Sequence, residues 1–439
     1  MNRSRQFLAA STALLAMVAG AIVLMLAPWP LLLVLLLALV LWMAFTRSGR
    51  QAAQVSRVAV ATLPQRMGAS SVVVIGIAGV VGVLVALLAM GEGFRATLEQ
   101  TGSDDAVVVM RAGAQTELNS VLGRDDVTLI SQAAGVLKDA AGRPLASPEV
   151  VVVASLPKKS NGLDANVEIR GVGPQIWPLH ADLGITAGRR FTPGMRELIV
   201  GKGALAEFAG LEPGSTLSLN NQTWDIVGSF DSGDAHNSEL WGDFDVVGSA
   251  YRRGSSASLV TARLTSAAAF DTFKAALAAD PRLKVEVKTT RAYYSEQSEG
   301  LSRLIRILGS TVGAIMAIGA IFGALNTMYA AVASRAREIA TLRAIGFRGL
   351  PVVVSVLLET MLLALAGGLL GAAIAWLAFN DYSASTLGSN FSQVVFAFKV
   401  SPGLMWTGLR WALAIGFIGG LFPALRAARL PVTTALREL

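Results

Sequence analysis

A short arginine-rich stretch between two long apolar runs constrains this chain more than any other feature. Residues Ser334 to Arg348 read SRAREIATLRAIGFR, in which five of fifteen residues are charged and four are Arg. About 20 apolar residues precede it and a similar run follows, enough on each side to cross a bilayer. Charges this dense are costly inside hydrocarbon, and Arg in short loops marks the cytoplasmic side. The stretch is therefore expected to be a short basic helix at the cytoplasmic membrane face.

The composition is that of an integral membrane protein. Of 439 residues, 53% are hydrophobic and 15% are charged, and the mean hydropathy is +0.55. Residues 91–300 hold 20 Lys and Arg against 26 Asp and Glu, whereas the rest of the chain holds 17 against 4. The basic surplus lies in short loops beside apolar runs, which indicates topology and argues against a nucleic-acid partner. Because Cys is absent, disulfides and thiolate metal sites are excluded.

The apolar runs predict six transmembrane helices with both termini in the cytoplasm. The first two surround a Pro28-Trp29-Pro30 turn and form a hairpin; the alternative is a signal peptide, but no small-x-small cleavage motif precedes the turn. Residues 51–66 follow as an amphipathic helix on the inner leaflet, or else as a plain linker. The spans are expected at about 7–27, 31–45, 70–90, 304–331, 352–377 and 404–425, flanked by cytoplasmic Arg3, Arg5, Arg47, Arg50, Arg57, Arg66, Arg426, Arg429 and Arg437. Arg410, near the outer end of the last span, is expected to snorkel beside Trp406 and Trp411.

Residues 91–300 have the pattern of a translocated α+β domain. The third span is expected to exit at Gly91-Glu92-Gly93, and from Arg291 a helical pattern runs without a breaker into the fourth span as a stalk. Residues 380–399 are expected to be a second outer loop. Strands are predicted at 106–110, 150–154, 167–172, 197–201, 224–230, 256–264 and 284–288, and helices at 127–138 and 266–279.

The sequence shows no catalytic constellation, so the chain is predicted not to be an enzyme and to bind no metal or cofactor directly. Gly201-Lys202 lacks the upstream Gly and the following Ser or Thr of a P-loop. His180 and His236 have no ligand partners at useful spacing and are expected to be surface or structural residues. Glu359, about two turns into the fifth span, is expected to make a structural hydrogen bond to a neighbouring helix and not to relay protons.

Two patterns in the last third of the chain predict contacts. The basic stretch alternates Arg335, Arg337, Arg343 and Arg348 with Ile339, Leu342, Ile345 and Phe347, and Gly346 supplies a stop, so an exposed amphipathic helix could dock in another protein's groove. The plain alternative is a basic loop that only fixes topology. Small residues recur four apart, a spacing that lets helices pack closely within the chain or across a dimer seam: Gly319 and Gly323, Gly367 and Gly371, Gly416 and Gly420.

At these residues the chain resembles the FtsX-like permease family, specifically its MacB-type members. The resemblance is carried by SRAREIATLRAIGFR, by LLETMLLALAGGLLGAAIAW (357–376) and by GLFPALRAARLPVTTALREL (420–439). Gly91-Glu92-Gly93, ELIVGKGALAEFAGLEPGSTLSL (197–219) and WDIVGSFD (224–231) are similar to the family's extracytoplasmic domain. The likeness covers roughly residues 52–439.

The resemblance implies an α-helical membrane protein with a four-helix FtsX-like core and an α+β extracytoplasmic domain of two lobes called porter and sabre, the sabre-like lobe near 165–250. The hairpin at residues 7–45 departs from the family pattern, because it adds two spans to this core. The domains expected are residues 1–50 (hairpin), 51–69 (amphipathic helix), 70–91 (third span), 92–300 (MacB-like periplasmic domain) and 301–439 (permease domain, with a coupling helix at 334–348). The residues expected to couple to an ATPase are Ser334, Arg335, Arg337, Glu338, Ile339, Leu342, Arg343, Ile345 and Gly346.

The resemblance also implies function and partners. The chain would be the permease subunit of an ABC complex in the bacterial inner membrane, working as a homo- or heterodimer by mechanotransmission. ATP and Mg would bind to a separate ATPase, and a periplasmic adaptor or outer-membrane channel could join the complex. The alternative is an FtsX-like regulator that activates a cell-wall hydrolase or senses envelope-active peptides; an outer domain of about 210 residues favours export or extraction of an envelope substrate.

Overall fold

The computed structural model describes residues 3–388 and 390–429, and the chain divides into two compact units. The helical unit comprises Met1–Ala89, Ile305–Asn380 and Val400–Leu439. The sheet unit comprises Met90–Leu304 and Asp381–Lys399. The predicted basic residue Arg437 lies outside the described residues.

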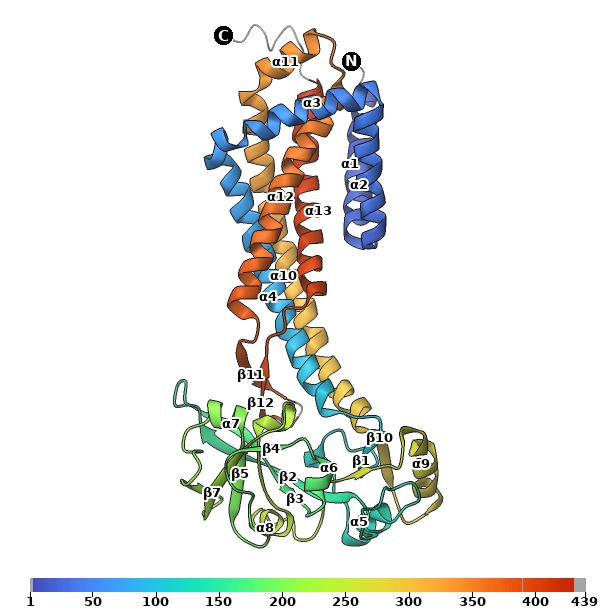
Figure 1. Cartoon of the computed structure of the whole chain (residues 1–439), viewed down its shortest axis with the longest axis vertical. Coiled ribbons are helices and arrows are strands. Elements are labelled where there is room, and N and C mark those ends of the chain that lie inside the picture. Colours follow the sequence, from blue (N-terminus) through green and yellow to red (C-terminus); the bar gives the residue numbers. More distant parts are fainter. Residues whose placement is uncertain (1–2, 389, 430–439) are drawn as a thin grey trace. The chain divides into compact units, whose positions relative to one another are not determined.

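The helical unit is built from long apolar helices (Figure 1). Among the described residues, four helices are long and apolar enough to cross a membrane, and a fifth crossing is possible where α2 and α3 meet at a bend of 101°. In the first helix of the hairpin, Leu14–Leu26 forms a shorter apolar segment. The helices are α1 (Arg3–Leu26), α2 (Trp29–Phe45), α3 (Arg47–Ala61), α4 (Met67–Thr101), α10 (Thr290–Ser334), α11 (Ala336–Ala344), α12 (Gly349–Phe379) and α13 (Pro402–Arg429).

Glycines set the closest helix approaches in this unit. A Cβ on Gly371 of α12 would lie 2.4 Å from the Ala78 carbonyl oxygen of α4, and one on Gly367 would lie 2.8 Å from that of Val74. Gly416 and Gly420 of α13 meet α12 in the same way, at the Ala364 and Thr360 side chains. By contrast, a Cβ on Gly319 or Gly323 of α10 would meet no atom within 4 Å among the described residues. Four of the six predicted packing glycines therefore lie at helix contacts within the chain, and two do not.

The N-terminal hairpin packs on α13. A Cβ on Gly20 of α1 would lie 2.4 Å from the Phe417 ring, so only Gly allows this approach. Near the other end of α1, Arg410 donates to the Met25 carbonyl at 3.2 Å and lies over the Trp406 ring at 5.4 Å. Arg410 was expected only to snorkel beside Trp406 and Trp411; it also binds a carbonyl in the last turn of α1, where helix carbonyls lack internal partners.

The sheet unit is organised on one ten-stranded mixed sheet. The strand order is β10-β1-β9-β2-β3-β8-β5-β7-β4, with β6 paired to β7. The β3–β8 and β5–β7 pairs are parallel and the others antiparallel. The strands are β1 (Ala106–Arg111), β2 (Ala146–Pro157), β3 (Asp164–Val172), β4 (Gly184–Gly188), β5 (Glu197–Gly201), β6 (Thr216–Leu219), β7 (Gln222–Asp231), β8 (Glu239–Asp243), β9 (Leu259–Arg263) and β10 (Val285–Thr289).

Of the apolar clusters that pack on this sheet, two lie on different parts of it. One gathers around Trp224, Phe208 and Ile169, and the other around Phe273, Ile130 and Val109. The first draws on residues 150–250 and the second on the segments before and after it, so a single sheet joins two core regions. The helices that cover the sheet are α5 (Arg124–Ser131), α6 (Ile176–Leu179), α7 (Lys202–Glu207), α8 (Phe244–Ala250) and α9 (Phe270–Ala279).

Several predicted boundaries were wrong for identifiable reasons. The helix of the third span continues beyond the expected exit at Gly91 to Thr101, with Arg95 bonded to Glu92 and Glu99 at 2.9 Å each. The helix predicted at 127–138 runs instead from Arg124 to Ser131 with Gln132 as its C-cap, and Gly135, at a φ of +97°, lies in the turn that follows. The strands β4, β6 and β8 were not predicted. The expected loop 380–399 contains the hairpin β11 (Ser383–Leu387) and β12 (Gln393–Ala397).

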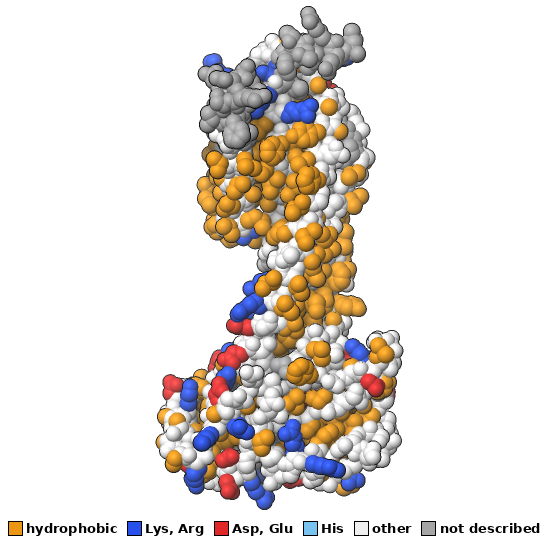
Figure 2. Space-filling view, turned by 180° about the vertical axis from the view of Figure 1, so that it is seen from behind, with side chains coloured by type: hydrophobic (Ala, Val, Ile, Leu, Met, Phe, Trp, Pro, Cys, Tyr) orange, Lys and Arg blue, Asp and Glu red, His pale blue; other side chains and the backbone are white. Residues whose placement is uncertain are grey.

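The surfaces of the two units differ as their sequences predict (Figure 2). Over the helical unit, apolar side chains cover the surface, including Leu33, Ile315 and Leu369, each more than half exposed. Over the sheet unit, Lys, Arg, Asp and Glu are spread among polar side chains. A water-exposed surface would not carry so continuous an apolar cover, and lipid is the solvent that fits it.

Candidate functional site

The α11 helix is a nine-residue element held between α10 and α12. Ser334 is the last residue of α10, and a break at Arg335 separates the two helices. At the other end Gly346 has a φ of +108°; the Gly346 amide donates to the Arg343 carbonyl and the Phe347 amide to the Leu342 carbonyl, both at 3.1 Å. This is a Schellman motif, so Gly346 ends the helix as predicted. The helix is shorter than the 334–348 range expected from the sequence.

Arg335 anchors α11 by pairing with Glu359 of α12. Its Nη1 donates to Glu359 Oε2 at 2.7 Å and its Nη2 to Oε1 at 3.0 Å, a bidentate pair. Nη2 also donates to Thr62 Oγ1, at the end of α3, at 3.3 Å. The two charged side chains are 10% and 5% exposed. The structural partner predicted for Glu359 is therefore Arg335, which sequence reasoning had instead placed on the docking surface.

The remaining residues of the stretch divide between a buried and an exposed face. Ile339 and Ala340 are buried, and Leu342 and Arg343 are half-buried. Ile339 packs with Met328, Val352 and Val356. Six exposed residues share one side of the short helix and its end: Arg337, Glu338, Thr341, Ala344, Ile345 and Gly346. Ser334 before the helix and Arg348 after it are exposed as well. Of the nine residues that the sequence predicted to contact an ATPase, only the exposed ones are therefore accessible to a partner protein.

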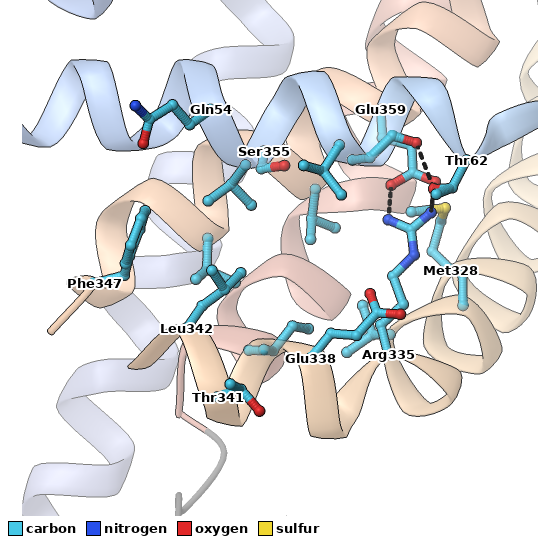
Figure 3. A pocket seen from close by; sticks show the side chains of 18 residues that line it. Gln54, Thr62, Met328, Arg335, Glu338, Thr341, Leu342, Phe347, Ser355 and Glu359 are labelled. Atoms are coloured by element: carbon cyan, nitrogen blue, oxygen red, sulfur yellow. Dashed lines mark hydrogen bonds and ion pairs between the residues drawn. The ribbon is translucent and has the colours of Figure 1, made fainter. Parts of the chain in front are cut away.

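A cavity of about 500 Å³ lies between α3, α11 and α12 (Figure 3). Its walls are mostly aliphatic, and the Arg335–Glu359 pair borders one side. The sequence did not predict this cavity, because the cavity forms only where α3 lies across α12. No local sequence pattern encodes that contact. The apolar lining residues are Val55, Val58, Ala59, Met328, Ala331, Val332, Ile339, Leu342, Phe347, Val352 and Val356.

The sheet unit holds a second polar centre, around Arg170 of β3. The buried guanidinium donates to four carboxylates: Glu239 at 2.8 Å, Glu149 and Glu117 at 2.9 Å, and Glu168 at 2.7 Å. One Arg cannot neutralise four buried carboxylates. Burial and the adjacent Glu239 carboxylate accordingly raise the pKa of Glu168 to about 8, and burial raises that of Glu149.

Both histidines belong to this centre. The His180 and His236 rings lie 5.0 Å apart, and His236 Nδ1 is 3.1 Å from Asp234 Oδ1. Burial opposes the charged form of His236, but Asp234 and Glu239 outweigh it and raise its pKa to about 9. Burial, with His236 beside it, lowers the pKa of His180 to about 3. Of the two predicted alternatives, surface or structural residues, both histidines fit the structural one. His236 is buried in the sheet unit.

The β11–β12 hairpin binds to the same centre. Asn390 Nδ2 and Ser392 Oγ donate to Glu168 Oε2 at 3.0 and 3.2 Å. The Val395 amide donates to Ser238 Oγ at 2.8 Å, and the Phe396 ring meets Phe94 at 5.6 Å. The segment between α12 and α13 is therefore an integral part of the sheet unit.

Two family models match the chain. Residues 70–280 match the MacB-like periplasmic core domain, and residues 310–432 match the FtsX-like permease C-terminal domain. Together they cover most of the chain.

Individual relatives agree with these matches. The chain is 23% identical to the macrolide export ATP-binding/permease protein MacB of Azoarcus sp. over 89% of its own length and 60% of that protein. It is 31% identical to the protein of the same name from Campylobacter jejuni, over 31% of this chain and 20% of that protein. The chain thus spans 60% or less of the length of these relatives. The periplasmic region of MacB from Actinobacillus actinomycetemcomitans aligns with 44% of this chain and 92% of its own at 14% identity and a TM-score of 0.33. From its two matched domains, the chain belongs to the MacB/FtsX-like family of ABC-transporter permeases.

Proposed function

We propose that the chain is the permease subunit of an ABC complex, in which ATP hydrolysis by a separate ATPase moves the extracytoplasmic sheet unit to export or extract an envelope substrate. ATP and Mg bind to the ATPase. The observation that carries the proposal is α11, a short basic helix anchored on one face and exposed on the other. Helices of this kind bind in grooves of partner proteins.

The anchoring of α11 supports force transmission. A docking element transmits a displacement only if it cannot swing away from its own protein. The bidentate Arg335–Glu359 pair and the burial of Ile339 and Ala340 hold α11 against α10 and α12. A push on the exposed face would therefore act on two long helices together.

Chain continuity supports the same mechanism. The 45-residue α10 runs unbroken from Thr290, directly after β10, to Ser334, directly before α11. No Pro interrupts it, and an unbroken helix is stiff on this length scale. We infer that α10, with α4, carries motion from the ATPase side to the sheet unit.

We further propose six spans in the inner membrane, with α11 and both termini cytoplasmic. Arg47, Arg50 and Arg57 on α3, Arg337 and Arg343 on α11, and Arg426 and Arg429 on α13 then lie on one side, in agreement with the positive-inside rule. Gly319 and Gly323, which face no other part of the described chain, suit the seam of a permease dimer.

The test is a double substitution on the exposed face, Glu338→Arg with Ile345→Asp. Both side chains are exposed, Ile345 by 72%, so the permease should fold and insert normally. ATPase stimulation by the permease should fall at least about tenfold, since a charge reversal and an apolar loss at an interface centre each cost more than 1 kcal/mol. The measurement is ATP turnover in proteoliposomes.

The matched control is Leu350→Asp, also exposed but on α12 beyond Gly346. It should keep normal stimulation. If the double variant stimulated the ATPase as well as the parent chain, α11 would not be the coupling element.

A further inference from the structure

The cavity behind α11 has a mouth between α3 and α11. Of its lining residues, Gln54 and Val58 of α3 and Glu338 and Thr341 of α11 are exposed, and Val58 is 62% exposed. Ala59, Ile339 and Val352, deeper in the wall, are buried. The site is thus a pocket with a mixed polar and apolar rim and an aliphatic interior (Figure 3).

Helix α3 forms the outer wall of the pocket, and its character indicates which molecules can reach the mouth. In α3, Gly49, Ala52, Ser56 and Ala59 are buried on one side, while Arg57 and Val60 are exposed. A basic amphipathic helix of this kind lies in the membrane interface, among lipid headgroups and the first methylenes of their chains. The pocket beneath it is then in direct reach of lipid.

Size, chemistry and charge agree on one class of ligand. A volume of about 500 Å³ is in the range of ordinary ligand sites, and a wall of Val, Ala, Met, Ile and Leu side chains suits a flexible saturated chain. None of the five Arg of α3 and α11 lines the pocket, but the exposed Arg57 and Arg337 directly adjoin the mouth residues Val58 and Glu338 in sequence, which favours a negatively charged headgroup.

We propose that this pocket binds one acyl chain of an anionic phospholipid, whose headgroup stays at the mouth between α3 and α11. The placement of this face at the inner leaflet rests on the function proposed above; the pocket and its chemistry do not. The bound chain fills the space between α3 and α11 and supports α11 from behind. An empty pocket would leave the apolar wall around Leu342 and Phe347 without contacts.

The test uses the full chain in nanodiscs that contain either a photoactivatable phosphatidylglycerol or the matching phosphatidylcholine. Crosslinked peptides are identified by mass spectrometry. Phosphatidylglycerol should label peptides of α3 and α11, and phosphatidylcholine should label them much less. Ala59→Phe places a ring in the pocket and should reduce labelling about tenfold, because each methylene denied burial weakens binding severalfold.

Val58→Trp provides an independent block that does not depend on core packing, since Val58 is at the exposed mouth. It should also reduce labelling about tenfold. The control is Val60→Trp, on the same helix, 40% exposed and outside the lining. It should leave labelling within about twofold of the parent chain.

Equal labelling by both lipids, or unchanged labelling in Val58→Trp and Ala59→Phe, would show annular lipid only and would overturn the proposal. The readout needs no ATPase. The lipid-labelling test therefore remains valid if α11 proves not to dock an ATPase. The ATPase test with Glu338→Arg, Ile345→Asp remains valid if the pocket proves to bind no lipid.

Discussion

Arg335 is the residue on which the position of α11 depends most. Its two terminal nitrogens reach both oxygens of Glu359, and both side chains are almost fully buried. Removing one partner of a buried ion pair leaves an uncompensated charge, which costs more than the pair itself contributes.

Glu359→Gln should therefore destabilise the helical unit by about 3–5 kcal/mol. The double change Arg335→Met, Glu359→Met, which removes both charges, should recover most of that loss. Thermal unfolding in detergent, followed by helical circular dichroism, measures both. Arg348→Met, at an exposed position, is the control and should unfold with the parent chain.

Glu168 gives the sheet unit a pH dependence. Its pKa is about 8 in the folded protein, above the ordinary value of 4.5, so the folded form holds a proton that the unfolded chain has lost. Stability must then fall as pH rises from about 4.5 to about 8. His236 acts in the same direction between 6.5 and about 9, because its protonated form is the one stabilised by folding.

Glu168→Gln should remove the part of the pH-dependent loss of folding stability that comes from the Glu168 carboxyl, about 2 kcal/mol between pH 6 and pH 9. The melting midpoint of the sheet unit, read from Trp fluorescence at both pH values, reports it. Glu212→Gln, an exposed carboxylate whose pKa is lowered by Lys159, should keep the parent slope. If the melting midpoint of Glu168→Gln changed with pH as much as that of the parent chain, Glu168 would be ionised at both pH values.

At the scale of elements, glycines decide which helices of the helical unit can touch. Gly371→Val would drive a side chain into the Ala78 carbonyl, 2.4 Å from the new Cβ, and should destabilise the unit by about 1–3 kcal/mol. Gly319→Val meets no atom in the described chain and should leave monomer unfolding unchanged.

These two variants also test the dimer seam. If α10 pairs with a second permease through Gly319, Gly319→Val should lower the dimer fraction in crosslinking or mass photometry without changing the melting midpoint. An unchanged dimer fraction would place the seam elsewhere.

The elements also show where sequence patterns succeed. Long apolar runs and arginine clusters predicted α4, α10, α12 and α13, because lipid admits few alternatives to a helix. The short run Glu197–Gly201, with the apolar residues Leu, Ile and Val at its centre, predicted β5 to the residue. The short strands β4 and β8 escaped, since their partners lie far away in the sequence and set their conformation. Strand β6 pairs with the adjacent β7 across a turn at Asn220 and Asn221, both at positive φ, a local hairpin signal that the sequence analysis missed.

The candidate site was predictable only as a stretch. The Arg and apolar residues of 334–348 indicated a helix, and Gly346 its end. Which Arg faces inward depends on Glu359, 24 residues away, and on the break between α10 and α11. The Arg170 centre was invisible for the same reason, since three of its four carboxylates come from distant parts of the chain.

For the whole molecule, the absence of Cys allows a direct test of the proposed topology. Single cysteines at Trp29 and Asn221 should react with an impermeant maleimide added outside intact spheroplasts. A cysteine at Ala344 should react only after lysis. All three positions are exposed in the structure. Labelling of Ala344→Cys from outside would contradict both the topology and the coupling role.

The docking of β11–β12 has a practical consequence for anyone who wishes to study the outer domain alone. A fragment cut at residues 90 and 304 would omit Asn390, Ser392 and Phe396, leaving Glu168 without two donors and the Phe94 cluster open to water. Such a fragment should be prone to aggregate. Appending 381–399 through a flexible tether should restore its solubility, because this outer module is assembled from two separate lengths of chain.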